Sequence, residues 1–184
     1  MKIPEKAKRV FKGVIFEVYQ WDQEMFDGTQ ATYEAIKRAD TVQVIATQGD
    51  RVLISSEEQP GKERFLTLLG GRVEDGEESL AAIKRELREE SGLESSDWEV
   101  FNVYSAPGKI EWNVHIFIAR DCQLSGEKHL DAGERIEVKA LSFEEFLAAI
   151  ESTDFRGREI LFDLLRMKLE PKKLEEFRKK LFRK

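Results

Sequence analysis

The sequence is poor in cysteine and contains no long run of apolar residues. Its single cysteine, Cys122, cannot form a disulfide within the chain. Because an apolar segment precedes it, we expect a buried thiol rather than a nucleophile. No stretch approaches the roughly 18 apolar residues that a membrane-spanning helix needs, and the segment Met1–Lys6 lacks the apolar core of a secretion signal. These absences predict no membrane association and a cytoplasmic location, where a lone thiol stays reduced.

The chain also lacks an excess of positive charge. It has 36 acidic and 30 basic residues, which gives a net charge of −6, so nucleic acid is not an expected partner. One segment, Pro171–Lys184, differs because it holds seven Lys or Arg against two Glu. We interpret this segment as the solvated face of an amphipathic helix rather than as a nucleic-acid or membrane patch.

The order of predicted elements is a β-hairpin, then a mixed α/β region, then helices. Val10–Trp21 and Thr29–Arg38 flank the turn dipeptide Asp27-Gly28 and predict an antiparallel hairpin. The further strands are expected at Thr41–Thr47, Arg51–Ser55, Phe65–Leu69, Trp98–Ser105, Val114–Ala119 and Ile136–Leu141. The helices are expected at Glu77–Ser91 with Gly92 as terminator, Phe143–Ile150 with a capping box of Ser142 and Glu145, Phe155–Leu169 and Leu174–Phe182. We therefore predict an N-terminal β-hairpin element at 1–39, a catalytic domain at 40–150 and a helical extension at 151–184.

The helix at Glu77–Ser91 lies within a motif that carries chemistry. The segment Gly71–Leu93 reads GRVEDGEESLAAIKRELREESGL. On a helix, Glu86 and Glu90 lie on one face with Glu89 nearby, because residues three and four apart are neighbours. Like charges at this spacing repel, and a hard cation such as Mg²⁺ or Mn²⁺ compensates for that repulsion.

Other residues of the motif support this interpretation. An apolar stripe of Leu80, Ile83 and Leu87 is expected to bury the other side of the helix against a sheet. Arg85 can pair with Glu77 or Glu89 and hold carboxylates in their ionised form. A solvated, salt-bridged helix is the alternative reading of the glutamates taken alone, but it does not explain the glycine loop and the spacing.

The segment resembles the Nudix box, G-x5-E-x7-R-E-U-x-E-E-x-G-U, where U is apolar. Seven fixed identities and two apolar positions all match, which is far more specific than a short glycine motif. The resemblance implies a mixed-sheet α/β/α sandwich and metal-dependent hydrolysis of a diphosphate linked to a second group. It implies Gly70, through its carbonyl, and Glu86, Glu89 and Glu90 as metal ligands, with Arg85 and Glu89 also among the catalytic residues.

Features outside the box are similar to the ADP-ribose and nucleoside diphosphate sugar pyrophosphatases of this family. In that branch a small N-terminal β-domain commonly exchanges across a dimer, which implies a homodimer and substrate contacts from residues 1–39. The branch also places an adenine-stacking aromatic, an acidic base contact and a phosphate-binding arginine in a segment that matches Tyr33, Glu34 and Arg38.

The branch carries its catalytic glutamate on a loop that matches Glu134. Glu134 is our candidate general base, with Asp131 and Glu137 as alternatives, and a solvated acidic loop is the other interpretation. The chain departs from the branch after the second core strand, where Ser56–Gly61 contains Gln59 but no arginine. A missing phosphate-binding cation favours a nucleotide sugar other than ADP-ribose itself.

The expected reaction is therefore Mg²⁺-dependent hydrolysis of ADP-ribose or a related nucleoside diphosphate sugar to a nucleoside monophosphate and a sugar phosphate. Two alternatives stay open. One is a nucleoside triphosphate or RNA 5′-end pyrophosphohydrolase, although such enzymes need no N-terminal hairpin. The other is a non-catalytic nucleotide-sensing module, although such modules often lose box carboxylates that are all present here.

Overall fold

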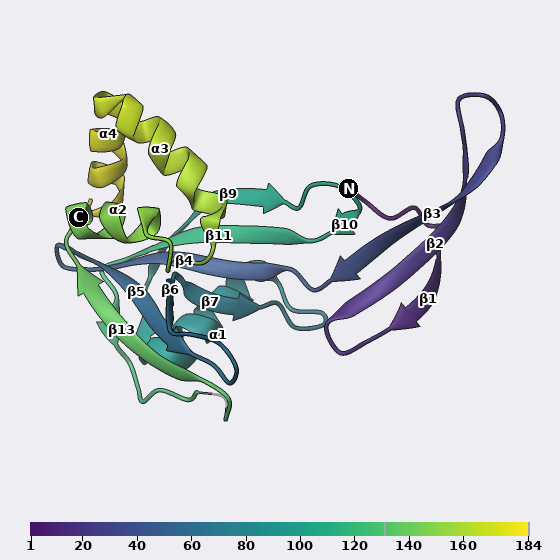
Figure 1. The fold of residues 1–184 in the computed structure, drawn as a ribbon. Coiled ribbons are helices and arrows are strands. Elements are labelled where there is room, and N and C mark those ends of the chain that lie inside the picture. The colour runs from purple at the N-terminus through teal and green to yellow at the C-terminus, as the bar shows by residue number, and fades with distance from the viewer. Residues whose placement is uncertain (131, 184) are drawn as a thin grey trace.

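A computed structural model describes residues 1–130 and 132–183. Its N-terminal part is a four-stranded sheet that projects to one side of the remainder of the molecule (Figure 1). The strand order is β1-β2-β3-β10, antiparallel except for β10, which runs parallel to β3. The strands are β1 (Lys8–Lys12), β2 (Phe16–Glu24), β3 (Gln30–Arg38) and β10 (Ile110–Glu111).

This sheet is larger than the predicted hairpin. The prediction of one strand over Val10–Trp21 is wrong, because the chain reverses at Gly13, whose N–H donates to the carbonyl of Phe16 at 2.8 Å. The reversal splits the segment into β1 and β2, and it pairs Phe11 with Val18. A glycine inside an apolar run marks such a bend.

The central sheet is mixed and has seven strands. Its main order is β13-β5-β4-β11-β9, with β6 added to β5 and β7 added to β4. β4 and β11 run parallel, and the other pairs among the described strands of this sheet are antiparallel. The strands are β4 (Thr41–Gln48), β5 (Arg51–Glu58), β6 (Phe65–Thr67), β7 (Leu69–Arg72), β9 (Asp97–Ser105), β11 (Asn113–Arg120) and β13 (Arg135–Leu141), and a small separate pair is formed by β8 (Leu93–Glu94) and β12 (Gln123–Leu124).

Helices cover both faces of the central sheet (Figure 1). Alternate residues of β4 point to opposite faces, so Val44 packs with Ile83 and Leu87 of α1, while Ile45 packs with residues of α2, α3 and α4. Burial on both faces explains why β4 is almost continuously apolar. The helices are α1 (Ser79–Ser91), α2 (Phe143–Glu151), α3 (Leu161–Leu169) and α4 (Pro171–Leu181), with a 3₁₀ turn η1 (Arg158–Ile160) before α3. The predicted α/β/α sandwich with an N-terminal antiparallel element is confirmed.

The helix ends test the sequence predictions in detail. Gly92 ends α1 in the left-handed conformation, and Ser142 and Glu145 form the predicted capping box of α2. The prediction that a helix spans all of Phe155–Leu169 is wrong at its start. The N–H of Arg156 donates to the carbonyl of Leu66 at 2.7 Å, next to a bridge between Leu66 and Phe155. The helix therefore begins only after this segment has paired with β6.

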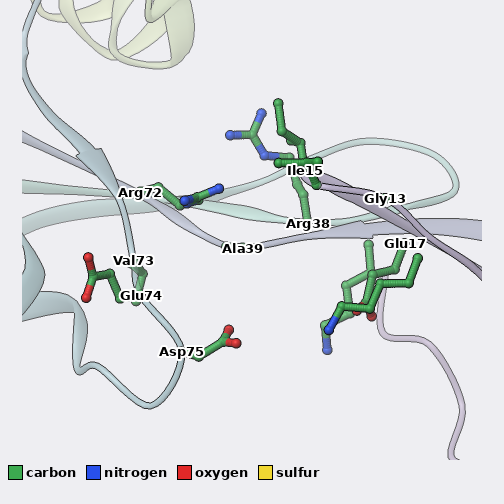
Figure 2. A pocket seen from close by; sticks show the side chains of 12 residues that line it. Gly13, Ile15, Glu17, Arg38, Ala39, Arg72, Val73, Glu74 and Asp75 are labelled. Atoms are coloured by element: carbon green, nitrogen blue, oxygen red, sulfur yellow. The ribbon is translucent and has the colours of Figure 1, made fainter. Parts of the chain in front are cut away.

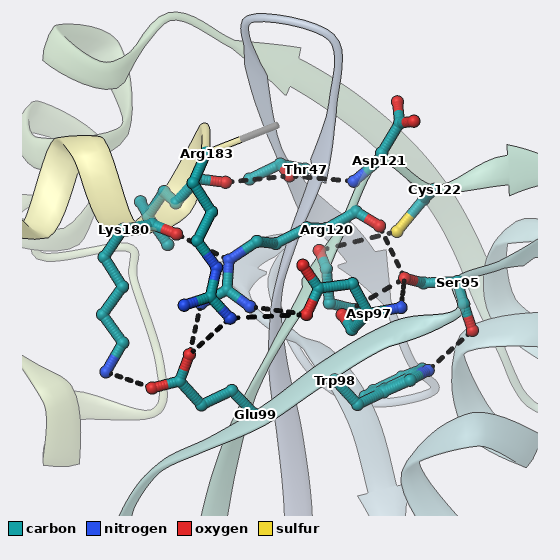
Figure 3. Close-up of polar contacts among 12 residues, drawn as sticks. Thr47, Ser95, Asp97, Trp98, Glu99, Arg120, Asp121, Cys122, Lys180 and Arg183 are labelled. Carbon is teal, nitrogen blue, oxygen red and sulfur yellow. Dashed lines mark hydrogen bonds and ion pairs between the residues drawn. The ribbon is translucent and has the colours of Figure 1, made fainter.

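The C-terminal helices share the core of the central sheet. Leu164, Phe177 and Leu181 belong to the same buried cluster as Phe146 of α2 and Ile116 of β11. Lys180 of α4 also forms an ion pair with Glu99 of β9 at 2.6 Å, within the network around Arg120 (Figure 3). None of the described helices has the length and apolar character to cross a membrane.

Candidate active site

The box glutamates lie where α1 crosses the glycines of β7. The N–H of Gly70 donates to Oε2 of Glu90 at 2.8 Å, and Glu90 is buried. Glu86 lies against Gly71, where an added Cβ would be 2.4 Å from Oε1 of Glu86. Gly70 has φ +145°, and an added Cβ there would be 2.1 Å from the carbonyl oxygen of Val42. Both glycines are thus needed to bring backbone and carboxylates together.

The helix buries a narrower stripe than expected. Ile83 and Leu87 are fully buried, together with Ala82, as their spacing predicts. Leu80 is 40% exposed, so its assignment to the buried stripe is wrong. The buried side of α1 is consequently set by Ala82, Ile83 and Leu87.

Arg85 binds three glutamates at once. Its Nε and one terminal nitrogen contact the two carboxylate oxygens of Glu77 at 3.1 and 3.0 Å. Its other terminal nitrogen donates to Glu86 at 2.9 Å and to Glu89 at 3.0 Å. The bond to Glu77 and the adjacent carboxylates raise the pKa of Arg85 above its ordinary value, so the guanidinium stays charged. Arg85 fixes the glutamates in position. The helix starts at Ser79 rather than at the predicted Glu77, because Glu78, its N-cap residue, has an extended backbone.

The carboxylates of this site are crowded in a poorly solvated place. Burial raises the pKa of the Glu90 carboxyl well above its usual range, and the charges of Glu57, Glu86 and Glu134 raise it further, against the Gly70 hydrogen bond. Burial likewise raises the pKa of Glu86, although Arg85 opposes the rise. A site that must hold these groups ionised needs a cation.

Glu57 is a member of this cluster that sequence reasoning missed. It lies near the end of β5, is 7% exposed, and accepts a hydrogen bond from Oγ of Ser55 at 2.7 Å. Burial raises its pKa, and the charge of Glu134 adds to the rise. The signal in the sequence is a glutamate two residues beyond the apolar run of Arg51–Ser55, and a lone glutamate at the end of a strand is by itself unspecific.

One cavity of about 570 Å³ brings most of the predicted residues together. Among the predicted site residues, it is lined by Arg38, Gly70, Arg85, Glu86, Glu89, Glu90 and Glu134, and Gln59 also faces it. These residues come from β3, β7, α1 and the segment before β13. Of the alternatives to Glu134, Glu137 is exposed on β13, pairs with Arg64 at 3.2 Å and does not line the cavity, while Asp131 is outside the described residues.

Tyr33 and Glu34 do not line this cavity. The Tyr33 ring lies 5.8 Å from the ring of Trp21, centroid to centroid, and Nζ of Lys109 is 4.3 Å from the Tyr33 centroid. Glu34 is exposed and accepts a hydrogen bond from Gln20 at 2.7 Å. Within one chain, the structure brings Arg38 to the carboxylates but leaves these two residues further along β3.

The donor chemistry of the site fits a hard divalent cation. The groups available are the carboxylates of Glu86, Glu89 and Glu90 and backbone oxygens of β7, and oxygen-only donors suit Mg²⁺ or Mn²⁺. Within residues 1–130 and 132–183, no three acidic or histidine side chains already converge as a metal-binding group. The reason lies in the contacts above, because Arg85 holds Glu86 and Glu89 while Gly70 holds Glu90.

Comparisons with known proteins agree with this geometry. The family model described as "NUDIX domain" matches residues 37–164. The chain is 28% identical over 151 residues to the ADP-ribose pyrophosphatase of Bacillus subtilis (strain 168), covering 80% of this chain and 82% of that protein. It is 25% identical over 152 residues to the methanol dehydrogenase activator of Bacillus methanolicus, covering 79% and 81%. A solved structure titled as an ADP compounds hydrolase superposes with a TM-score of 0.72 at 21% identity, covering 94% of this chain and 98% of that one.

Proposed function

Because the chain is a Nudix hydrolase, a member of the NUDIX domain family, we propose that it hydrolyses the diphosphate linkage of ADP-ribose or a related nucleoside diphosphate sugar. The products would be a nucleoside monophosphate and a sugar phosphate. The observation that carries this proposal is the cavity in which the box carboxylates, Glu134 and Arg38 face one another. A metal-neutralised carboxylate cluster beside an arginine suits an anionic diphosphate.

In this proposal the carboxylates of Glu86 and Glu90, assisted by Glu89 and the Gly70 carbonyl, hold Mg²⁺, and Mn²⁺ could serve in its place. The bound metal supplies neutralisation of the charge that develops on phosphate oxygens. Arg85 keeps Glu86 and Glu89 in place through hydrogen bonds of 2.9 and 3.0 Å.

Glu134 is the proposed general base. Glu134 lines the same cavity as Glu86 and Glu90, and its charge contributes to raising the pKa of Glu57, Glu86 and Glu90. A water oxygen attacks one phosphorus, the bond from that phosphorus to the bridging oxygen breaks, and Glu134 accepts the proton that the water loses.

We also propose that Tyr33 and Glu34 contact the base of the substrate in a homodimer formed through the N-terminal sheet. This sheet exposes several large apolar side chains, which are Val10, Phe11, Val14, Ile15, Phe16 and Ile36. Exposed apolar patches of this kind mark interaction surfaces. A dimer would bury them and could bring Tyr33 and Glu34 to the partner's cavity. The cytoplasmic location stays a prediction.

The reaction can be tested with purified protein, Mg²⁺ and a panel of ADP-ribose, ADP-, GDP- and UDP-sugars, nucleoside triphosphates and capped or triphosphorylated RNA. We expect a nucleoside monophosphate and a sugar phosphate from at least one diphosphate sugar. Selective cleavage of triphosphates or RNA would instead support the pyrophosphohydrolase alternative. Binding without cleavage of any compound would support a nucleotide-sensing module.

The role of Glu134 has a matched control in Glu137. Glu134→Gln should lower turnover by orders of magnitude, because the amide cannot accept a proton from the attacking water. Substrate affinity should change little, because the glutamine side chain has nearly the same shape as that of glutamate. Glu137→Gln, on exposed β13 outside the cavity, should leave turnover near that of the wild type. Equal rates for both variants would reject Glu134 as the base.

The dimer can be tested by light scattering after chromatography. A double variant, Phe11→Ser with Val14→Ser, removes two side chains that are 57% and 95% exposed. We expect a dimer for the wild type and a shift toward monomer for the variant. A wild-type monomer at all concentrations would overturn this part of the proposal.

A further inference from the structure

Two arginines from separate strands face the catalytic cavity side by side. Arg38 ends β3 and Arg72 ends β7. Both line the cavity that holds the carboxylates, and both line an adjoining cavity of about 560 Å³ between the N-terminal sheet and the loop after β7. Figure 2 shows the two side chains reaching into this adjoining cavity near Ile15, with Glu74 and Asp75 on the loop beyond them. The arginines therefore stand at the junction of the two spaces.

The charge on each arginine is not balanced by an ion pair within residues 1–130 and 132–183. Among the residues that the structure describes, no carboxylate forms an ion pair with either guanidinium group. The acidic residue nearest along β2, Glu17, is already paired with Arg9 at 2.8 Å. The Nε of Arg38 is buried and has no hydrogen-bond partner.

Their proximity is unfavourable in the absence of an anion. Burial lowers the pKa of Arg38, and the positive charge of Arg72 lowers it further. Arg38 is held instead by aromatic rings, with its guanidinium carbon 4.6 Å from the centroid of Trp112 and 5.9 Å from that of Phe16. Ring contacts fix the orientation of a cation but do not neutralise it. The buried Nε of Arg38 thus lacks an acceptor, and the exposed Arg72 beside it adds a second guanidinium group that can bind an anion.

Phosphate oxygens fit this requirement. A guanidinium group presents a planar fork of donors that matches two oxygens of one phosphate. Gln59, which faces the same cavity, is neutral, so it cannot supply positive charge on its side of the cavity. We propose that Arg72 is a substrate-binding residue that acts with Arg38 as a two-arginine clamp on the diphosphate. The inference rests on the proposed function for its choice of a diphosphate as ligand.

The clamp can be tested by binding as well as by turnover. The variant is Arg72→Gln, and the matched control is Arg88→Gln, an exposed arginine of α1 that lies 3.9 Å from Glu94 and does not line the cavity. The probe is inorganic pyrophosphate, titrated calorimetrically in the presence of Mg²⁺. Losing charge-assisted hydrogen bonds should weaken binding about tenfold to hundredfold in Arg72→Gln. Arg72→Lys should lie between the wild type and Arg72→Gln, and Arg88→Gln should bind as the wild type does.

Turnover gives a second, separable readout. With the preferred diphosphate sugar, Arg72→Gln should raise KM by about tenfold or more while kcat changes less. Pyrophosphate binding to Arg72→Gln within about twofold of the wild type, or no binding to the wild type, would overturn the clamp. If no diphosphate sugar is hydrolysed yet pyrophosphate binding depends on Arg72, the proposed function fails while the clamp stands.

Discussion

Oε2 of Glu90 accepts a hydrogen bond from the backbone N–H of Gly70 at 2.8 Å. This bond joins the last glutamate of the box helix to β7, the strand in which the box begins. The bond gives the buried carboxylate of Glu90 a hydrogen-bond donor and fixes its orientation. It also fixes the position of α1 relative to β7, so that Glu86 meets the second glycine, Gly71. The geometry of the site therefore depends on contacts at both ends of the box.

Replacing Glu90 by glutamine should separate catalysis from folding. Glu90→Gln keeps the shape and the acceptor oxygen for Gly70 but loses a metal-binding charge, so turnover should fall by orders of magnitude. Without metal, Glu90→Gln should be at least as stable to unfolding as the wild type, because burial disfavours the negative charge that the variant lacks. Steady-state kinetics and thermal unfolding measure the two effects. Glu78→Gln, exposed at the start of the same helix, serves as control, and a Glu90→Gln enzyme with wild-type rates would reject the metal assignment.

The stability of the metal-free protein should fall as pH rises. Burial raises the pKa of Glu90 in the folded state above its ordinary value of 4.5, so the folded state binds more protons than the unfolded state above that pH. Stability is then fully present below the ordinary value and is lost as pH rises toward the raised one. Thermal unfolding in a chelator between about pH 5 and about pH 8 measures this. The fall in stability should be smaller in Glu90→Gln than in the wild type. An equal or larger fall in the variant would contradict a raised pKa for Glu90.

Mg²⁺ should offset the loss of stability that the metal-free protein shows at higher pH. A cation that binds only the folded carboxylate cluster stabilises the fold by mass action, so Tm should rise with Mg²⁺ concentration. The rise should be larger at higher pH, where the glutamates are ionised. A Tm that does not respond to Mg²⁺ or Mn²⁺ would contradict the metal site.

The glycines of β7 should be intolerant of a side chain. In Gly70→Ala, the added Cβ would lie 2.1 Å from the carbonyl oxygen of Val42, at a backbone φ of +145°. We expect a loss of about 3 kcal/mol or more in the free energy of unfolding, measured by denaturant titration. Gly126→Ala is the control, because nothing lies within 4 Å of its added Cβ, and its stability should stay near that of the wild type.

Arg120 should anchor α4 to the central sheet. It is 2% exposed, pairs with Asp97 and Glu99, and its Nε donates to the carbonyl of Lys180 (Figure 3). Arg120→Met should lower the free energy of unfolding by about 2 kcal/mol, less than for a fully buried pair because both carboxylates are partly exposed. Hydrogen exchange should quicken in α4, whereas turnover should change little, because Arg120 does not line the catalytic cavity. Arg51→Met, at an exposed position, is the control.

The thiol of Cys122 should be unreactive in the folded protein. It is fully buried, and burial raises the pKa of its thiol to about 11. A thiol-specific reagent at neutral pH should therefore modify it only after denaturation. Mass spectrometry after timed exposure measures the modification. Rapid labelling of the native protein would contradict the buried position.

Much of the fold followed from local patterns. The apolar spacing of Ile83 and Leu87, the terminator Gly92 and the capping box at Ser142 each act within a few residues, so the sequence predicts them directly. The family predicted from the box is likewise confirmed. The errors came where a distant segment competes with local preference. Residues Phe155 and Arg156 pair with Leu66 instead of joining a helix, and no local signal contains that contact.

The same division holds for the candidate site. By itself, the sequence determined the box helix, its glutamates and the glycines that meet them, because helical periodicity and fixed spacing place these residues within 23 positions of one another. Only the tertiary structure decided which other residues join them. Arg38, Arg72 and Glu134 come together because β3, β7 and the segment before β13 converge on one cavity. Glu57 of β5 lies outside the lining of that cavity, but its charge acts on Glu90. Packing and electrostatic interactions join residues that are distant in the sequence but close in space, so local sequence patterns do not reveal which residues complete the site.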